Sequence, residues 1–289
     1  MKRVLSIMIA LAMMFILVAC EVPVEEMKEP SQVGTGNNNE KIEVTITEKV
    51  LVDEAGVKIT AKSVDMGSMF GPEIKLLIVN NSGKNLTFQS RNASVNGYMI
   101  ETMMSVDVAT GKKANDGLTF MRSDLDACGI SVIADMEVEF HIFDSDTWDT
   151  YLDTEAVQIK TSIADSYQYT YDDSGKVAYE GNGFKVVIKG LAEDESIFGP
   201  SIVVYIENTS KKDITVQVRN LSINGFMVEA LFSCDVKVGK RAVDTITFLE
   251  SDLEENEISS IEDVELSFHI FDLDEWETIV DTEVIKISF

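Results

Sequence analysis

Two short acidic turns hold the residues best suited to chemistry. Their sequences are Asp144-Ser-Asp146-Thr-Trp-Asp149 and, 128 positions later, Asp272-Leu-Asp274-Glu-Trp-Glu277. Carboxylates at alternating positions are hard oxygen ligands, which Ca²⁺ takes in sets of about six to eight. The candidate metal ligands are Asp144, Asp146, Asp149, Asp272, Asp274 and Glu277. The glycine and spacing of an EF-hand are missing, so the competing interpretation is that the aspartates form Asx turns.

A tryptophan lies in each acidic turn, at Trp148 and Trp276. Tryptophan is enriched at binding interfaces because it combines a large apolar ring with a polar N–H group. An exposed tryptophan beside carboxylates predicts contact with a basic or a carbohydrate ligand. The alternative is that Trp148 and Trp276 are buried and close one end of a β-sandwich.

The two histidines, His141 and His269, each lie in the sequence Phe-His-Ile-Phe-Asp. Glu139 shares a strand face with His141 and could join it as a transition-metal ligand. Ser267 replaces this glutamate in the second sequence, and no cysteine or further histidine joins either pair. The pattern therefore favours histidines that pack on a sheet and form local hydrogen bonds.

Two cysteines remain beyond the N-terminal region, Cys128 and Cys234, and their equivalents in the other copy are Asn256 and Val106. Neither can form a disulfide within its own copy. A bridge between the two remains open, but the pattern favours two unpaired thiols.

Sequence motifs of common enzymes are absent: the chain contains no G-x-S-x-G, G-x-G-x-x-G, Walker or H-E-x-x-H sequence. The paired carboxylates of a glycoside hydrolase cannot be picked out, because 50 acidic residues create many chance pairs. We therefore expect a protein without catalytic activity, with a carboxylate-dependent hydrolase as the weaker alternative.

An internal duplication supplies the elements that position these residues. A shift of 128 aligns the chain with itself from Phe70-Gly71-Pro72 onward, and Phe140–Asp144 meets Phe268–Asp272 without a gap. Each copy is long enough to be a complete domain. We predict domains at residues 41–164 and 165–289.

Each copy has the pattern of β-structure. Residues 136–142 and 264–270 alternate between apolar and polar, as half-buried strands do. Asn96-Gly97 and Asn224-Gly225 predict two-residue hairpin turns. Residues 123–126 and 251–254 fit a capping box, which predicts one short helix per copy. Seven or so strands with frequent turns indicate a β-sandwich.

The segments Val108–Phe120 and Val236–Phe248 resemble the immunoglobulin-like domains of unknown function found in lipoproteins of Gram-positive bacteria. Ile78–Ser82 and Ile206–Ser210, each a strand that runs into a polar turn, resemble the same family. The resemblance implies two tandem extracellular immunoglobulin-like β-sandwiches and supplies no catalytic residues. The paired cysteines of antibody domains are missing from each copy.

The N-terminus has the features of an export signal. Lys2 and Arg3 precede the apolar run Val4–Ala19, which is too short for a comfortable membrane span and closes on Leu17-Val18-Ala19-Cys20. This ending resembles the bacterial lipobox, after which cleavage leaves Cys20 as the lipidated residue. We predict a signal peptide at residues 1–19 and, because residues 20–40 lack apolar periodicity, a flexible linker there.

The composition narrows the choice of partners. With 24 basic and 50 acidic residues the formal net charge is −26, which disfavours nucleic acid and anionic headgroups. The membrane contact is then the lipid anchor alone, on the extracytoplasmic face. We expect a non-catalytic binding module of the cell envelope, whose partner is an envelope protein or another basic or carbohydrate ligand. The structural alternative is a spacer that Ca²⁺ stabilises through the acidic turns.

Overall fold

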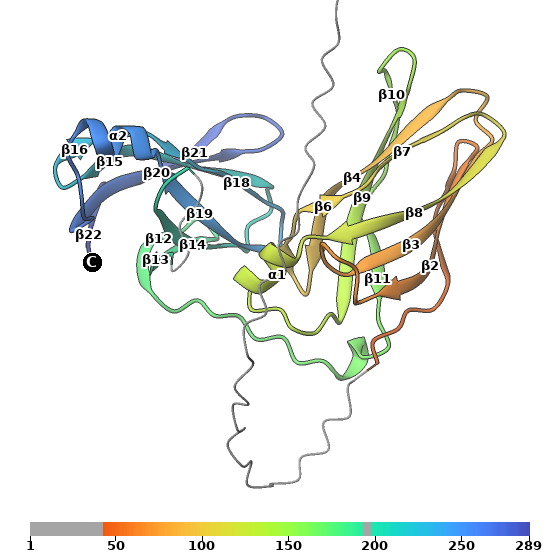
Figure 1. Ribbon diagram of the computed structural model, residues 1–289, viewed down its shortest axis with the longest axis horizontal. Coiled ribbons are helices and arrows are strands. Elements are labelled where there is room, and N and C mark those ends of the chain that lie inside the picture. Colours follow the sequence, from red (N-terminus) through yellow and green to blue (C-terminus); the bar gives the residue numbers. More distant parts are fainter. Residues whose placement is uncertain (1–42, 193–197) are drawn as a thin grey trace, which may run out of the picture. The chain divides into compact units, whose positions relative to one another are not determined.

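The computed structural model describes residues 43–192 and 198–289, which fold mainly into β-strands with two short helices (Figure 1). The predicted signal peptide at 1–19, the lipidation site Cys20 and the linker at 20–40 lie outside the described residues. Within the described ranges, no helix is long and apolar enough to cross a membrane.

The first copy consists of two sheets that share one apolar core. The strands of the first sheet, in spatial order, are β1 (Lys49–Glu54), β2 (Val57–Asp65), β3 (Glu73–Asn80), β8 (Lys112–Phe120) and β6 (Thr102–Met103). The strands facing them are β4 (Leu86–Val95), β5 (Tyr98–Met99), β7 (Ser105–Val108), β9 (Asp135–Asp144), β10 (Thr150–Asp153) and β11 (Val157–Lys160). Side chains from both sheets, such as Leu76 and Phe88, are buried together, and helix α1 (Arg122–Ala127) follows β8.

The second copy repeats this order of elements after the short 3₁₀ helix η1 (Ala164–Ser166). Its first set of strands is β12 (Lys176–Gly181), β13 (Phe184–Leu191), β14 (Ser201–Asn208), β19 (Arg241–Phe248) and β17 (Ala230–Leu231). Its second set is β15 (Ile214–Ile223), β16 (Phe226–Met227), β18 (Ser233–Val236), β20 (Asp263–Asp272), β21 (Thr278–Asp281) and β22 (Ile285–Ser288). Helix α2 (Glu250–Glu255) follows β19. The fold class expected from the sequence, all-β with tandem immunoglobulin-like sandwiches and one short helix in each, is confirmed.

The alternating pattern and the hairpin turns have the predicted geometry. Strand β9 buries Met136, Val138, Phe140 and Ile142 and leaves the residues between them partly exposed. Asn96 and Gly97 have φ of 50° and 85°, and their equivalents in the second copy have 51° and 85°. Positive φ at both central residues is what a hairpin turn that matches the strand twist requires.

The predicted capping boxes are wrong, although the helices exist. Helix α1 starts at Arg122, so Ser123 lies inside the first turn and the N-cap is Met121, which forms no side-chain cap. The Asp124 carboxylate instead accepts a hydrogen bond from the backbone N–H of Glu101, at 2.9 Å. The equivalent Asp252 likewise accepts one from the N–H of Glu229, at 2.7 Å. These aspartates therefore tie each helix to the connection between two short strands, β5 and β6 in the first copy and β16 and β17 in the second.

A buried asparagine organises one end of each sandwich. The Asn80 amide donates to the carbonyl of Lys84 at 2.8 Å and to that of Val108 at 2.7 Å, and its oxygen accepts from the N–H of Ser82 at 3.0 Å. Asn208 makes the equivalent three bonds in the second copy. Because every polar atom of these side chains is bonded, they can be buried at low cost while they link three chain segments.

The two copies belong to one compact unit that begins at Glu43. Their contact is made through β5 of the first copy, which pairs in parallel with the start of β19 of the second. Val187 and Tyr205 of the second copy pack into the core of the first, and Met99 of the first packs against the core of the second.

Candidate functional site

The two tryptophans lie on the surface, in the turns that follow β9 and β20. Trp148 is 76% exposed and Trp276 is 75% exposed, so the interpretation that these rings close the sandwich ends is wrong. Each turn is closed by a hydrogen bond from the backbone N–H of the tryptophan to the backbone carbonyl of Asp144 or Asp272, at 2.8 and 2.9 Å. The tryptophans have φ of 65° and 60°, in the left-handed region that bulky side chains rarely adopt.

Each exposed indole is held by an aromatic stack. The ring of Trp148 stacks on Phe143, with centroids 5.4 Å apart and an interplanar angle of 17°. Trp276 stacks on Phe271 at 5.6 Å and 23°. Phe143 and Phe271 are themselves buried, so the stack fixes each indole on the sheet while most of its surface stays open to solvent.

The aspartate that opens each turn is fixed by hydrogen bonds. One oxygen of Asp144 accepts from the N–H of Asp146 at 3.0 Å, and its other oxygen lies 2.9 Å from the ammonium of Lys84. Asp272 makes the equivalent Asx turn and pairs with Lys212 at 2.6 Å. The lysine, and then the backbone N–H groups, hold the pKa of both aspartates below the usual range. The Asx-turn interpretation of the sequence is thus confirmed.

The carboxylates predicted as calcium ligands do not form a ligand set. These residues are Asp144, Asp146, Asp149, Asp272, Asp274 and Glu277. In the described ranges, no group of three or more His, Cys, Asp or Glu side chains is placed to hold a metal ion. The opening aspartates already bind a lysine and backbone donors, and Asp149 accepts from the hydroxyl of Thr147 at 2.9 Å.

The histidines form local hydrogen bonds, as the sequence pattern favours. His141 Nδ1 lies 2.5 Å from Asp153 Oδ1, and His269 Nδ1 lies 2.6 Å from Asp281 Oδ1. Glu139, the other half of the suggested metal pair, instead accepts from the amide of Asn92 at 2.6 Å. Each histidine ring also packs against the phenylalanine of the tryptophan stack, at centroid distances of 5.4 and 5.2 Å.

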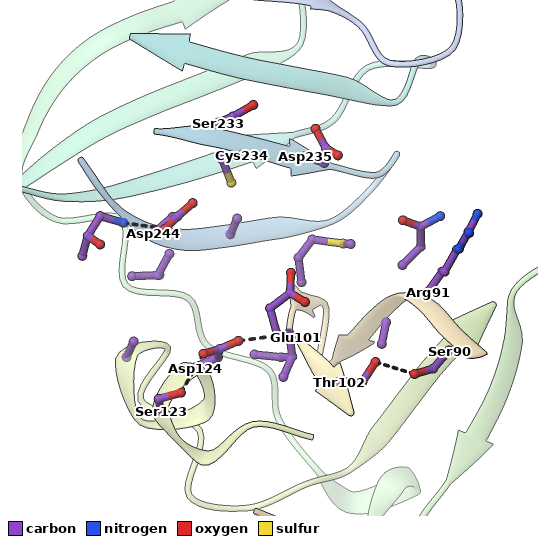
Figure 2. A pocket seen from close by; sticks show the side chains of 18 residues that line it. Ser90, Arg91, Glu101, Thr102, Ser123, Asp124, Ser233, Cys234, Asp235 and Asp244 are labelled. Carbon is purple, nitrogen blue, oxygen red and sulfur yellow. Dashed lines mark hydrogen bonds between the residues drawn. The ribbon is translucent and has the colours of Figure 1, made fainter. Parts of the chain in front are cut away.

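A second candidate site, which the sequence did not indicate, is a cavity of about 680 Å³ lined by residues of both copies. Figure 2 shows Glu101 and Asp124 of the first copy on one side and Cys234, Asp235 and Asp244 of the second on the other. A volume of this size suits a small ligand. Four carboxylates on elements far apart in sequence meet here only because the copies pack together, so no sequence pattern marks them.

Burial and repulsion between neighbouring carboxylates raise the pKa of two of these acids, Glu101 and Asp244. Desolvation at the cavity wall, followed by the charges of Asp124, Asp244 and Asp235, raises the pKa of Glu101. Desolvation is also the main cause of the raised pKa of Asp244. The cavity is therefore suited to a cationic group, and a protonated carboxyl within it could serve as a proton donor.

Among the described residues, Cys128 and Cys234 are both free, so the alternative of a bridge between them is wrong. Burial raises the pKa of the Cys128 thiol to about 12 and that of the Cys234 thiol well above its ordinary value. Both groups remain thiols at neutral pH, and neither is an activated nucleophile.

Comparisons with known proteins add little to this geometry. No protein-family model matches the chain, and no curated protein matches it. Among solved structures, the crystal structure of the YadV chaperone is similar over 75% of this chain and 92% of the chaperone chain, with 10% sequence identity and a TM-score of 0.23. A likeness at this level carries no argument about function.

Proposed function

We propose that this protein is a lipid-anchored, extracytoplasmic lipoprotein that acts without catalysis and binds a basic partner at the cell envelope. The binding surfaces are the two acidic turns at residues 144–149 and 272–277, called the tryptophan turns below. The observation that carries the proposal is the exposure of Trp148 and Trp276, each held on a fixed turn in the same way in both copies.

The conformation of these residues has an energetic cost. A bulky residue in the left-handed region costs on the order of 1–3 kcal/mol and persists where the surroundings impose it. Because the two rings are about three-quarters exposed, the apolar surface that they bury offsets only part of this conformational free energy. A rigid exposed indole is, in contrast, well suited to recognition, because little side-chain entropy is lost when a partner covers it.

The surrounding charge favours a cationic ligand. The face of an indole attracts ammonium and guanidinium groups, and each turn adds carboxylates beyond the one that pairs with lysine. In the first copy these are Asp146 and Asp149, and in the second they are Asp274 and Glu277. The net charge of −26 extends this attraction over the whole molecule. A lysine- or arginine-rich segment of an envelope protein can interact with both the indole face and the surrounding carboxylates, whereas a neutral carbohydrate has no positive charge for either.

A binding titration tests the tryptophan turns. The probes are a lysine- and arginine-rich peptide and a panel of neutral oligosaccharides, with fluorescence or calorimetry as the readout. We expect the double variant Trp148→Ala/Trp276→Ala to bind the peptide about tenfold more weakly or worse, with an unchanged thermal midpoint. Peptide binding by the native chain should also weaken as salt rises.

Met69→Ala is the matched control, because Met69 is 86% exposed and lies outside both turns. This variant should bind like the native chain. Salt-independent binding of an oligosaccharide that requires the same two tryptophans would replace the basic partner with a carbohydrate. Equal peptide binding by the native chain and the double variant would contradict the proposed site.

The anchor is supported by the sequence of residues 1–20 and has its own test. Replacing the cysteine of Leu17-Val18-Ala19-Cys20 removes the thiol to which the lipid is attached. We expect Cys20→Ala to move the protein from the membrane fraction to the medium, as measured by fractionation and immunoblotting. Retention of the variant in the membrane fraction would contradict lipid anchoring while leaving the binding proposal intact.

A further inference from the structure

The contact between the copies buries one particular hairpin of the first copy. Tyr98, which follows the Asn96-Gly97 turn, is only 4% exposed. Its ring packs edge-on against Tyr171 and Tyr205, with centroid distances of 5.5 and 6.5 Å. The backbone N–H of Arg241 donates to the carbonyl of Gly97 at 2.9 Å, which joins the hairpin to the start of β19.

The same hairpin in the second copy is uncovered. The shift of 128 places Phe226 and Met227 at the positions of Tyr98 and Met99. Phe226 is 49% exposed and Met227 is 69% exposed. A Cβ atom on Gly97 would meet the hydroxyl of Tyr171 at 3.0 Å, whereas nothing in the described structure lies within 4 Å of the equivalent position on Gly225.

The surface that covers the Tyr98 hairpin is formed by Tyr171, Tyr205 and Arg241 of the second copy. Two of these positions have equivalents in the first copy that no such hairpin covers. Arg241 corresponds to Lys113, at the start of β8, and Tyr205 corresponds to Leu77 on β3. Lys113 is exposed and Leu77 is half-buried. The first copy thus repeats the strand positions of Arg241 and Tyr205, whereas Tyr171 and Val187 correspond to Val44 and Thr60 at the shift of 127 that aligns Gly56 with Gly183. The chain carries a second hairpin on the second copy and part of its covering surface on the first.

We propose that these two surfaces join between molecules. The β16 hairpin, formed by the end of β15, the Asn224-Gly225 turn and β16, docks on the start of β8 of a second chain, so the protein associates head to tail. The occupant of the Phe226 surface is therefore a second copy of this chain. A contact between two different surfaces does not close on itself as a two-fold dimer does, so it can add further molecules.

The charges of one equivalent residue pair agree with this pairing. In the internal joint, Lys240 pairs with Glu137 at 2.7 Å, and the equivalent residues Lys112 and Glu265 keep opposite charges. A second internal pair, between Lys237 and Glu139 at 3.3 Å, becomes Ala109 and Ser267 and is lost. The joint between molecules should therefore be weaker than the internal one and should depend on protein concentration.

Sedimentation velocity over a range of concentrations tests the proposal. The sample is the mature chain from residue 20, with Cys20→Ser to prevent lipid attachment and with reductant present. We expect the mean mass to rise with concentration beyond that of a dimer. Phe226→Asp and, independently, Lys113→Glu should each remain monomeric, whereas Met69→Asp, which places the same charge on an exposed site elsewhere, should associate like the native chain.

Mixing the two variants gives the decisive result. Phe226→Asp retains an intact β8 surface and Lys113→Glu retains an intact β16 hairpin, so their mixture should form a dimer and nothing larger. A native chain that stays monomeric at every concentration would overturn the proposal. So would a dimer that Phe226→Asp abolishes but Lys113→Glu leaves unchanged, because that dimer would be a symmetric contact between two β16 hairpins. Thermal unfolding of each variant separates loss of association from loss of folding, and Met227→Asp replaces Phe226→Asp if the latter is unstable.

Discussion

At the scale of single residues, the side chains that open the two tryptophan turns combine a structural and an electrostatic role. Asp144 and Asp272 each bind backbone N–H groups with one oxygen and a lysine with the other. The lysines lie half exposed, so the ion pairs themselves contribute little. The hydrogen bonds to the backbone define the turn, and through it the position of the indole.

The lowered pKa of these aspartates predicts a dependence of stability on pH. The pKa of each aspartate in the folded protein lies below its unfolded value of about 3.9. The ionised carboxylates therefore stabilise the fold fully above that value, and this stabilisation disappears as the pH falls through the folded pKa. We expect Asp144→Asn/Asp272→Asn to lower the thermal midpoint at neutral pH, and the gap from the native chain to close in acid. Thermal unfolding monitored by circular dichroism measures this gap.

The exposed Asp165 provides the comparison for that experiment. Asp165→Asn should leave the midpoint close to native at both ends of the pH range. A gap for Asp144→Asn/Asp272→Asn that stays constant into acid would contradict the assignment of the stabilisation to these ionised carboxylates.

At the scale of elements, the two Asn-Gly hairpins are the same turn in different surroundings. Gly97 and Gly225 both have φ of 85°, so alanine at either position costs about 1–2 kcal/mol of backbone strain. Only Gly97 has a neighbour in the way, the hydroxyl of Tyr171, which also donates to the carbonyl of Asn96. We expect Gly97→Ala to lower the free energy of unfolding more than Gly225→Ala does, as measured by urea denaturation.

Equal losses for the two glycine variants would show that the contact around Tyr171 contributes nothing beyond the turn itself. The comparison uses each copy as the control for the other. It therefore separates the strain that is intrinsic to the hairpin from the packing that depends on contact between the copies.

At the scale of the whole molecule, duplication has produced two nearly equal sandwiches with unequal surfaces. The first copy uses its β5 hairpin to hold the second, while the second copy leaves its β16 hairpin open. The tryptophan turns, in contrast, have the same stacking and the same lysine-bound aspartate in both copies. The surroundings of the Asn-Gly hairpins thus differ between the copies, whereas the tryptophan turns have stayed the same.

The sequence by itself determined the features that depend on local periodicity and turn chemistry. Alternating apolar residues predicted the β-strands, the Asn-Gly pairs predicted the hairpins, and the aspartates of the acidic turns suggested Asx turns. These inferences succeed because the decisive contacts lie within a few residues along the chain. The capping boxes failed because Asp124 binds the backbone of Glu101, in the connection between β5 and β6 more than twenty residues away, which local spacing does not encode.

Only the tertiary structure decided that the indoles of Trp148 and Trp276 are exposed and that Cys128 and Cys234 are unpaired. It also showed that, among the described residues, the turn carboxylates form no group of three or more that could hold a metal ion. It also brought Glu101 and Asp244 to one cavity and covered one hairpin while leaving the other open. The physical reason is the same throughout. Burial, desolvation and ligand geometry depend on segments that meet through packing, and the order of residues along a strand does not specify which segments those are.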